Sequence, residues 1–245
     1  MNFIPDYHFW LVVVLLGAGM YASVAAGKLT LSGAVTGGLL GMAIFLGAGY
    51  TGLAMLGVFF ILGSAVTSYK FKLKQNLGLA EINKGRRTAS QAVANAGVAA
   101  LMGILAWVYP AQASGFRLML AAGFAAATAD TLSSELGNIY GRRFYNIRTW
   151  QKDTRGLDGV VSLEGTAFGI AGSIIISLVY AIGFGWSNQV YWIILAGTAG
   201  NLFDSWLGAT LERRGYLSND IVNFLNTFLG ALVALTLYWA FRSTL

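Results

Sequence analysis

The stretch AAATADTLSSELG, residues 125–137, decides which kind of fold this chain can adopt. It begins as a run of small apolar residues suited to lipid, yet it carries Asp130 and, five residues later, Glu135. A carboxylate inside a membrane helix is costly, so it persists only with a partner or with a function. The rest of the sequence has to show whether this helix spans a membrane and what its carboxylates face.

The composition is that of an integral membrane protein. The 245 residues are 56% hydrophobic and only 11% charged, whereas soluble domains carry about 25% charged residues. The absence of cysteine excludes disulfides, thiol chemistry and a Cys-based metal site. The N-terminus, MNFIPDYHFW, lacks the basic region of a cleaved signal peptide, so we expect the first apolar run to remain as a helix.

Apolar runs of about 17 to 25 residues, the length that crosses a bilayer as a helix, recur along the whole chain. The sequence therefore predicts an all-α, polytopic transmembrane helical bundle in one integral membrane domain, residues 1–245, with about eight spans and seven as the alternative. Only GAGYTG divides the second run from the third, and the Gly-rich second run is either continuous or re-entrant. The runs are 8–26, 31–48, 51–68, 89–109, 117–137, 164–185, 190–210 and 222–241.

The basic residues are distributed asymmetrically among the loops. With the N-terminus outside, every Lys and Arg except Arg117 and Arg242 falls in a cytoplasmic loop. This is the positive-inside pattern, and it predicts an integral protein of the inner (cytoplasmic) membrane whose long basic loops are cytoplasmic. Topology alone would also explain any single basic residue. The four loops are 27–30, 69–88, 138–163 and 211–221.

A second aspartate stands in a setting like that of Asp130. In GNLFDSWLGATLERRG, residues 200–215, Asp204 lies about as far from the cytoplasmic helix end as Asp130 does, and a hydroxyl residue follows each aspartate. Because the two helices run in the same direction, the carboxylates are expected at one depth, where they would form a Mg²⁺ site. Glu135 is a third candidate ligand, although it lies about 140° around the helix and could instead pair with a basic loop residue. Structural hydrogen bonding and an ion or proton relay are the alternatives for the aspartates.

Other polar residues cluster at predicted cytoplasmic helix starts. In NKGRRTASQAVANAG, residues 83–97, basic residues precede a helix that carries Gln91 and Asn95 on one face. Guanidinium groups beside a helix N-terminus suit a phosphate, while topology and interhelical hydrogen bonding are the alternatives. The preceding YKFKLKQN is interpreted as an interfacial segment, with Lys70 as the exception. The basic residues of the motif are Lys84, Arg86 and Arg87.

Two further motifs complete the candidate site. In RGLDGVVSLEGTAFG, residues 155–169, Asp158-Gly159 predicts a turn and Ser162 begins a helix, either to hold a phosphate or only to cap the helix. In SNDIVNFLN, residues 218–226, Asn223 is expected to face the interior. His8 is the only histidine and lies at the outer N-terminus, so histidine-based acid–base chemistry is not expected.

Carboxylates for Mg²⁺, cations for phosphates and an apolar bundle around them fit phosphoryl or nucleotidyl transfer to a lipid head group, which depends mainly on positioning and charge neutralisation. The candidate catalytic residues are Asp130, Asp204, Arg86 and Arg87. The candidate substrate- and nucleotide-binding residues are Lys70, Gln91, Asn95, Arg142, Arg143, Asp158, Ser162 and Asn223. The candidate metal ligands are Asp130, Asp204 and Glu135.

The ordered motifs KGRRTASQAVANAG, ATADTLSSELG, GLDGVVSLEGTAFG and GNLFDSWLGATLERRG resemble domain of unknown function 92, a family that includes the phytyl-phosphate kinase of tocopherol synthesis. The resemblance implies a membrane kinase that converts an isoprenyl monophosphate into its diphosphate with CTP or another nucleoside triphosphate. Its shared polar positions correspond to Gly85, Arg86, Arg87, Gln91, Asn95, Asp130, Thr131, Glu135, Asp158, Gly159, Ser162, Asp204, Ser205 and Asn223. Departures stand at Leu157, Val160 and Glu164.

Rival functions predict other features. A cytidylyltransferase that forms a CDP-lipid would use the same residues. A transporter would place polar residues near the bilayer midplane and would need an outer vestibule, and a lipid-binding scaffold would not need two matched aspartates. The expected partners are a nucleoside triphosphate, with CTP favoured, an isoprenyl phosphate lipid and membrane lipids. No nucleic acid is expected, and a homo-oligomer is left open.

Overall fold

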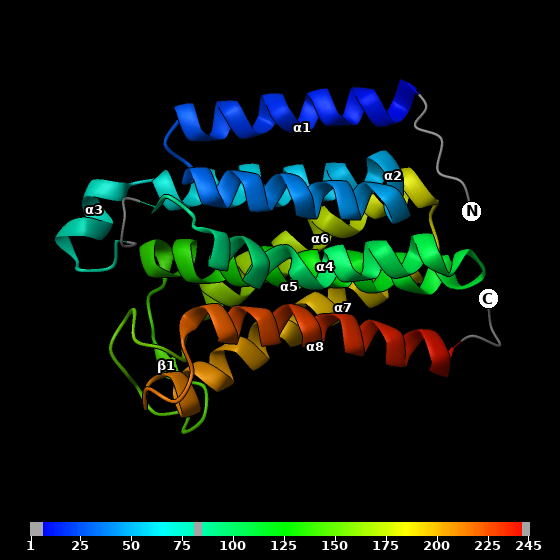
Figure 1. Cartoon of the computed structure of the whole chain (residues 1–245). Helices are drawn as coiled ribbons and strands as arrows, with labels where there is room; N and C mark the ends of the chain where they lie inside the picture. The colour runs from blue at the N-terminus through cyan, green and yellow to red at the C-terminus, as the bar shows by residue number, and fades with distance from the viewer. Residues whose placement is uncertain (1–6, 81–84, 242–245) are drawn as a thin grey trace.

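The chain folds into a bundle of long helices, shown in Figure 1. A computed structural model describes residues 7–80 and 85–241. Two short strands, β1 (Tyr145–Asn146) and β2 (Val160–Val161), are the regular β-structure in this part of the chain. The helices are α1 (Tyr7–Ala25), α2 (Leu31–Ser68), α3 (Phe71–Asn76), α4 (Ala89–Val108), η2 (Pro110–Gln112), α5 (Ala113–Tyr140), α6 (Leu163–Phe184), α7 (Gln189–Leu207), the π-helical η3 (Gly208–Glu212) and α8 (Asn219–Ala240).

Helix α2 is a hairpin of two membrane-length halves. At 1.5 Å per residue its 38 residues would extend about 57 Å, almost twice the hydrocarbon thickness of a bilayer. The chain reverses at Gly49, whose φ of 58° favours glycine. A Cβ on Gly41 would lie 3.3 Å from Leu56, which a straight helix would carry about 22 Å away. The division between the second and third predicted spans is therefore confirmed, with each half continuous.

Five helices in the described residues are long and apolar enough to cross a membrane: α1, α2, α4, α6 and α8. Because α2 supplies two passes, α5 and α7 complete the eight predicted spans. Helix α5 tolerates its polar residues because it packs against α2, α4, α6, α7 and α8, which separate it from lipid. Its buried face is rich in alanine, such as Ala121, Ala125 and Ala129, so these neighbours can approach closely.

The predicted basic loops gather at one end of the bundle, which we call the basic end. In Figure 1 this is the end that carries α3 and β1, whereas the first residues of α1 and the last residues of α8 lie at the opposite end. Arg117 lies away from the basic end. Its Nε donates to the carbonyl oxygen of Gly47, near the α2 turn, at 2.7 Å. The one-sided arrangement expected from the sequence is thus present, and it places the longest loops beside one another.

The longest of these loops is an ordered strap, residues 141–162, between α5 and α6. Its strands β1 and β2 pair antiparallel, with Tyr145 opposite Val161 and Asn146 opposite Val160. The predicted turn is present, since Gly159 has a φ of 73°. A Cβ on Gly159 would lie 2.2 Å from the Ala209 nitrogen, so the glycine lets the strap pack directly on η3.

Candidate functional site

Asp130 of α5 and Asp204 of α7 line one polar cavity of about 220 Å³ at the basic end. Asp130 is among the groups that interact with Asp204, together with Glu212 and Asn226. The expected convergence of two aspartates from different helices is therefore present. Small residues permit it, because a Cβ on Gly200 would lie 2.7 Å from both Ala126 and Asn226. The role of the two carboxylates as metal ligands remains a prediction.

Several buried polar atoms around the aspartates make no hydrogen bond of normal geometry within the described part of the chain, although Asn226 lies near enough to Asp204 to interact with it. They are Oδ2 of Asp204, Oδ1 of Asn201 and both amide atoms of Asn226. Buried polar atoms without partners are rare in folded proteins and often mark an ion or water site. Carboxylate and amide oxygens are also what Mg²⁺ prefers, and Mg²⁺ usually takes its remaining ligands from water and substrate phosphates. The residues present therefore fit a substrate-shared Mg²⁺.

Glu135 lines the same cavity, but its carboxylate is already paired with a cation, so its role as a third metal ligand stays a prediction. Its carboxylate forms a buried ion pair with Lys74 of α3. The Lys74 side chain is 2% exposed and also donates to the carbonyl oxygens of Val66 and Thr67. No group of three His, Cys, Asp or Glu side chains among the residues described is arranged to hold a metal. The alternative expectation, a basic partner for Glu135, is the one observed, and it removes Lys74 from the predicted interfacial segment.

Arg87 enters the cavity from the segment before α4. Its backbone NH donates to the Lys28 carbonyl and its own carbonyl accepts from the Thr30 NH, both at 3.0 Å, so the α1–α2 loop fixes its position. The guanidinium lies over the Phe59 ring, 4.9 Å from the centroid. A Cβ on Gly63 would lie 2.2 Å from Nη2, so the glycine makes room for this side chain.

Gln91 and Asn95, one and two turns into α4, also line the cavity. Gln91 completes a capping box: the Thr88 hydroxyl accepts from the Gln91 NH, and Gln91 Oε1 accepts from the Thr88 NH at 3.0 Å. Asn95 donates to the Gln91 carbonyl at 2.9 Å. Each amide thus makes a local structural hydrogen bond, and both side chains also line the cavity.

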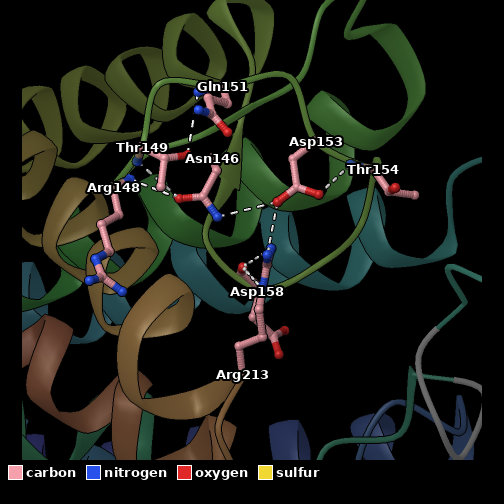
Figure 2. Close-up of polar contacts among 8 residues, drawn as sticks. All are labelled: Asn146, Arg148, Thr149, Gln151, Asp153, Thr154, Asp158 and Arg213. Atoms are coloured by element: carbon pink, nitrogen blue, oxygen red, sulfur yellow. Dashed lines mark hydrogen bonds and ion pairs between the residues drawn. The ribbon is translucent and has the colours of Figure 1, made fainter.

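The strap closes the cavity from outside. Asp158, Gly159 and Ser162 line it, and Ser162 caps α6 by accepting from the Gly165 NH at 3.0 Å. Arg213 anchors the strap, as Figure 2 shows: its Nη1 donates to Asp153 Oδ2 at 2.8 Å. Its Nε and Nη2 donate to the Asp158 carbonyl at 3.1 and 2.6 Å. The hydrogen bond from Arg213 to the Asp153 carboxylate lowers the pKa of Asp153 to about 2, together with hydrogen bonds from the Thr154 NH and the Asn146 side chain.

Four of the predicted basic site residues do not line the cavity. Lys70 lies over the rings of Tyr69 and Tyr140, and exposed Arg86 donates to the Leu29 carbonyl oxygen at 3.5 Å. Arg142 and Arg143 are exposed at the start of the strap. The prediction that these residues join Arg87 around the substrate is therefore not supported, and Lys84 lies outside the described residues. Asn223 does line the cavity, as expected.

Sequence reasoning missed part of the cavity wall. The sequence predicts Glu212 in the loop 211–221, but the π-helical turn η3 carries it into the lining, to which Asn219 also belongs. Burial and the nearby Asp158 raise the pKa of Glu212. The sequence analysis does not include Asn138, which also lines the cavity. Its spacing of seven residues from Thr131 puts both on one face of α5, and this spacing is the signal that could have identified it.

Comparison with known proteins extends over most of the chain. It is 33% identical over 235 residues to the uncharacterized membrane protein sll0875 of Synechocystis, covering 92% of this chain and 90% of that one. It is 30% identical over 233 residues to Protein VTE6, chloroplastic, of Arabidopsis thaliana, covering 92% and 68%. An uncharacterized membrane protein of Methanocaldococcus jannaschii, MJ0933, is 32% identical over 209 residues, 84% of each chain. No solved structure matches.

The match to a described family agrees with these relatives and with the helical bundle. The profile of the integral membrane protein family DUF92 covers residues 13–231, which include every cavity residue named above. The chain therefore belongs to the DUF92 family of integral membrane proteins.

Proposed function

We propose that this protein is a Mg²⁺-dependent isoprenyl-phosphate kinase that uses CTP or another nucleoside triphosphate. One observation carries the proposal: Asp130, Asp204 and Arg87 line a single cavity at the basic end. Two carboxylates suit a metal that bridges phosphates, and a guanidinium suits a phosphate. The family resemblance, which includes a phytyl-phosphate kinase, supports the same reaction class. The positive-inside rule assigns the basic end to the cytoplasm, where nucleoside triphosphates are available.

The proposed reaction needs little covalent help from the protein. An oxygen of the lipid monophosphate attacks the γ-phosphorus, the bond from that phosphorus to the β-phosphate oxygen breaks, and the products are a lipid diphosphate and a nucleoside diphosphate. The attacking oxygen is already anionic, so no strong base is required. Arg87 would hold the acceptor phosphate, while Asp130 and Asp204 would hold Mg²⁺. Bound there, the metal would neutralise charge on the transferring phosphates.

The size of the cavity limits what it can enclose. Sites for drug-sized ligands are typically about 300–1,000 Å³, and this one is about 220 Å³. It therefore suits the phosphates rather than a whole nucleoside triphosphate. We assign the ribose and base to the outer wall, formed by strap residues 156–161.

The test is turnover by purified protein in detergent with Mg²⁺, CTP or ATP, and phytyl, geranylgeranyl or farnesyl monophosphate. Mass spectrometry should detect the lipid diphosphate from wild type and on the order of 10²-fold less, or none, from Asp130→Asn or Asp204→Asn. Arg143→Gln is the matched control, because Arg143 is an exposed basic residue of the strap outside the cavity. Folded protein that binds no nucleotide and turns over no lipid would contradict the proposal.

The same assay separates the kinase from a cytidylyltransferase. A cytidylyltransferase would join the α-phosphate of CTP to the lipid phosphate and release pyrophosphate, so its product would be a CDP-lipid. A lipid diphosphate with CDP supports the kinase, whereas a CDP-lipid with pyrophosphate would replace it.

A further inference from the structure

A second cavity, of about 410 Å³, lies between α1, the two halves of α2 and the start of α4. We call it the apolar groove. Its walls are almost entirely hydrophobic, with Leu15, Leu16 and Met20 on α1 and Leu40, Leu53 and Phe60 on α2. Its volume falls within the range of about 300–1,000 Å³ that is typical of ligand sites. Helix α1 packs mainly on α2, so this side of the bundle is thinly covered, as Figure 1 shows.

The groove runs along the helices for most of the membrane thickness. Its lining on α2 extends from Gly33, near the basic end, to Tyr50, just past the turn at Gly49. Seventeen residues of helix correspond to about 25 Å, compared with a hydrocarbon thickness of about 30 Å. The groove therefore has the length and the chemistry to hold a long hydrocarbon chain parallel to the helices.

The groove and the polar cavity meet at two residues. Arg87 and Gln91 belong to the lining of both cavities. Phe59 and Gly63 position the Arg87 guanidinium, and the α1–α2 loop holds its backbone. A molecule with its chain in the groove would thus present its head group to Arg87, on the border of the cavity that contains Asp130 and Asp204.

We infer that the apolar groove binds the hydrocarbon chain of the isoprenyl monophosphate, with the phosphate at Arg87. The inference rests on the proposed function for the identity of the head group. A single groove with one guanidinium at its polar end suits one chain with one phosphate. The chain fixes the depth of the head group, so it determines how far the phosphate reaches toward the polar cavity.

The first test is photo-crosslinking with a geranylgeranyl monophosphate that carries a diazirine on its chain, in detergent and without nucleotide. The expected cross-links map by mass spectrometry to α1 and to both halves of α2. The matched probe is the diazirine-labelled prenyl alcohol, which lacks the phosphate and should label much less. Equal labelling by the alcohol would identify a general lipid groove and overturn the inference, as would labelling confined to α6, α7 and α8.

The second test fills the groove by substitution. Gly19 and Gly17 both lie on α1, and an added Cβ at either has nothing within 4 Å, but only Gly19 lines the groove. Gly19→Leu should raise KM for the C20 monophosphate at least tenfold and leave a C5 monophosphate nearly unaffected. Gly17→Leu is the control and should change neither. Gly37→Leu, which enters the groove from α2, should behave like Gly19→Leu.

The outcomes distinguish this inference from the proposed function. Groove labelling that depends on the phosphate and is lost in Gly19→Leu supports the inference, whether or not the protein forms a diphosphate. Failure to form a diphosphate with any nucleotide would overturn only the proposed kinase activity. Diphosphate formation with unchanged C20 labelling and KM in Gly19→Leu and Gly37→Leu would keep the kinase and overturn the groove.

Discussion

Glu135 and the pair of Asp130 and Asp204 all line the polar cavity, but these two acidic regions differ in what faces them. Glu135 pairs with Lys74, which packs α3 against α5. Asp204 interacts with Asp130, a second acid, and its Oδ2 is buried without a hydrogen-bond partner. In the first region the protein supplies the countercharge itself. In the second, Asp204 and Asp130 interact with each other in a cavity that Arg87 also lines, and a bound cation would stabilise these two acids.

This contrast shows that the presence of a carboxylate within a membrane helix does not by itself indicate a functional site. Glu135 satisfies the usual requirement for a buried charge through a partner within the same chain. Asp130 and Asp204 instead lie in one polar cavity and interact with each other, as the proposed phosphoryl-transfer site requires. Substitutions in the two regions should therefore have opposite effects on activity and on stability.

The largest effect is expected from Asp204→Asn. Activity should fall by on the order of 10²-fold or more, as when a preorganised electrostatic group is removed from a reaction centre. Thermal stability in detergent without Mg²⁺ should stay equal or rise, because one of two neighbouring acids is neutralised. Turnover assays and thermal unfolding check both parts. A destabilised Asp204→Asn would place this aspartate with Glu135 as a structural group.

The second effect concerns stability. Lys74→Met should lower the free energy of unfolding by about 3–5 kcal/mol, because it leaves Glu135 buried without its cation. The double variant Lys74→Met, Glu135→Leu should recover much of that loss, since both charges are then absent. Denaturant or thermal unfolding in detergent measures the cycle. Full stability in the single variant would contradict a structural role for the pair.

A third, smaller effect tests how Arg87 is held. Gly63→Ala places a methyl group 2.2 Å from Nη2 of Arg87, so the guanidinium must move. We expect KM for the lipid monophosphate to rise about tenfold, which corresponds to about 1.4 kcal/mol. The control is Gly63→Ala combined with Arg87→Ala, which should be no worse than Arg87→Ala alone. Additive losses would mean that the methyl group acts elsewhere.

The smallest effect concerns the anchor of the strap. The folded-state pKa of Asp153, about 2, is below its usual value of about 3.9. A depressed pKa stabilises the fold above the unfolded-state pKa, and this contribution disappears as pH falls from about 4 to about 2. Asp153→Asn should therefore be less stable than wild type at pH 7, with the difference vanishing near pH 2. Because the pair is partly exposed, the difference should be small. A constant difference across pH would exclude this ion pair as its cause.

The sequence identified the site better from acids and amides than from basic residues. Asp130, Asp204, Gln91, Asn95 and Asn223 all line the cavity. Polar groups of this kind are costly within a membrane, so their presence is informative. Lys70, Arg86, Arg142 and Arg143 do not line it, because positive charge in the loops of a membrane protein serves topology whether or not it touches substrate.

The sequence by itself determined the membrane bundle, the helix boundaries within a few residues and the one-sided distribution of charge, because these follow from hydrophobic length and local charge. Only the tertiary structure decided for eight spans over seven by placing a reversal at Gly49, and only it showed that Lys74 neutralises Glu135 and that η3 brings Glu212 to the cavity. It alone joined the groove to the cavity at Arg87. The physical reason is that partners and cavities depend on contacts between residues far apart in the chain, and periodicity does not encode those contacts.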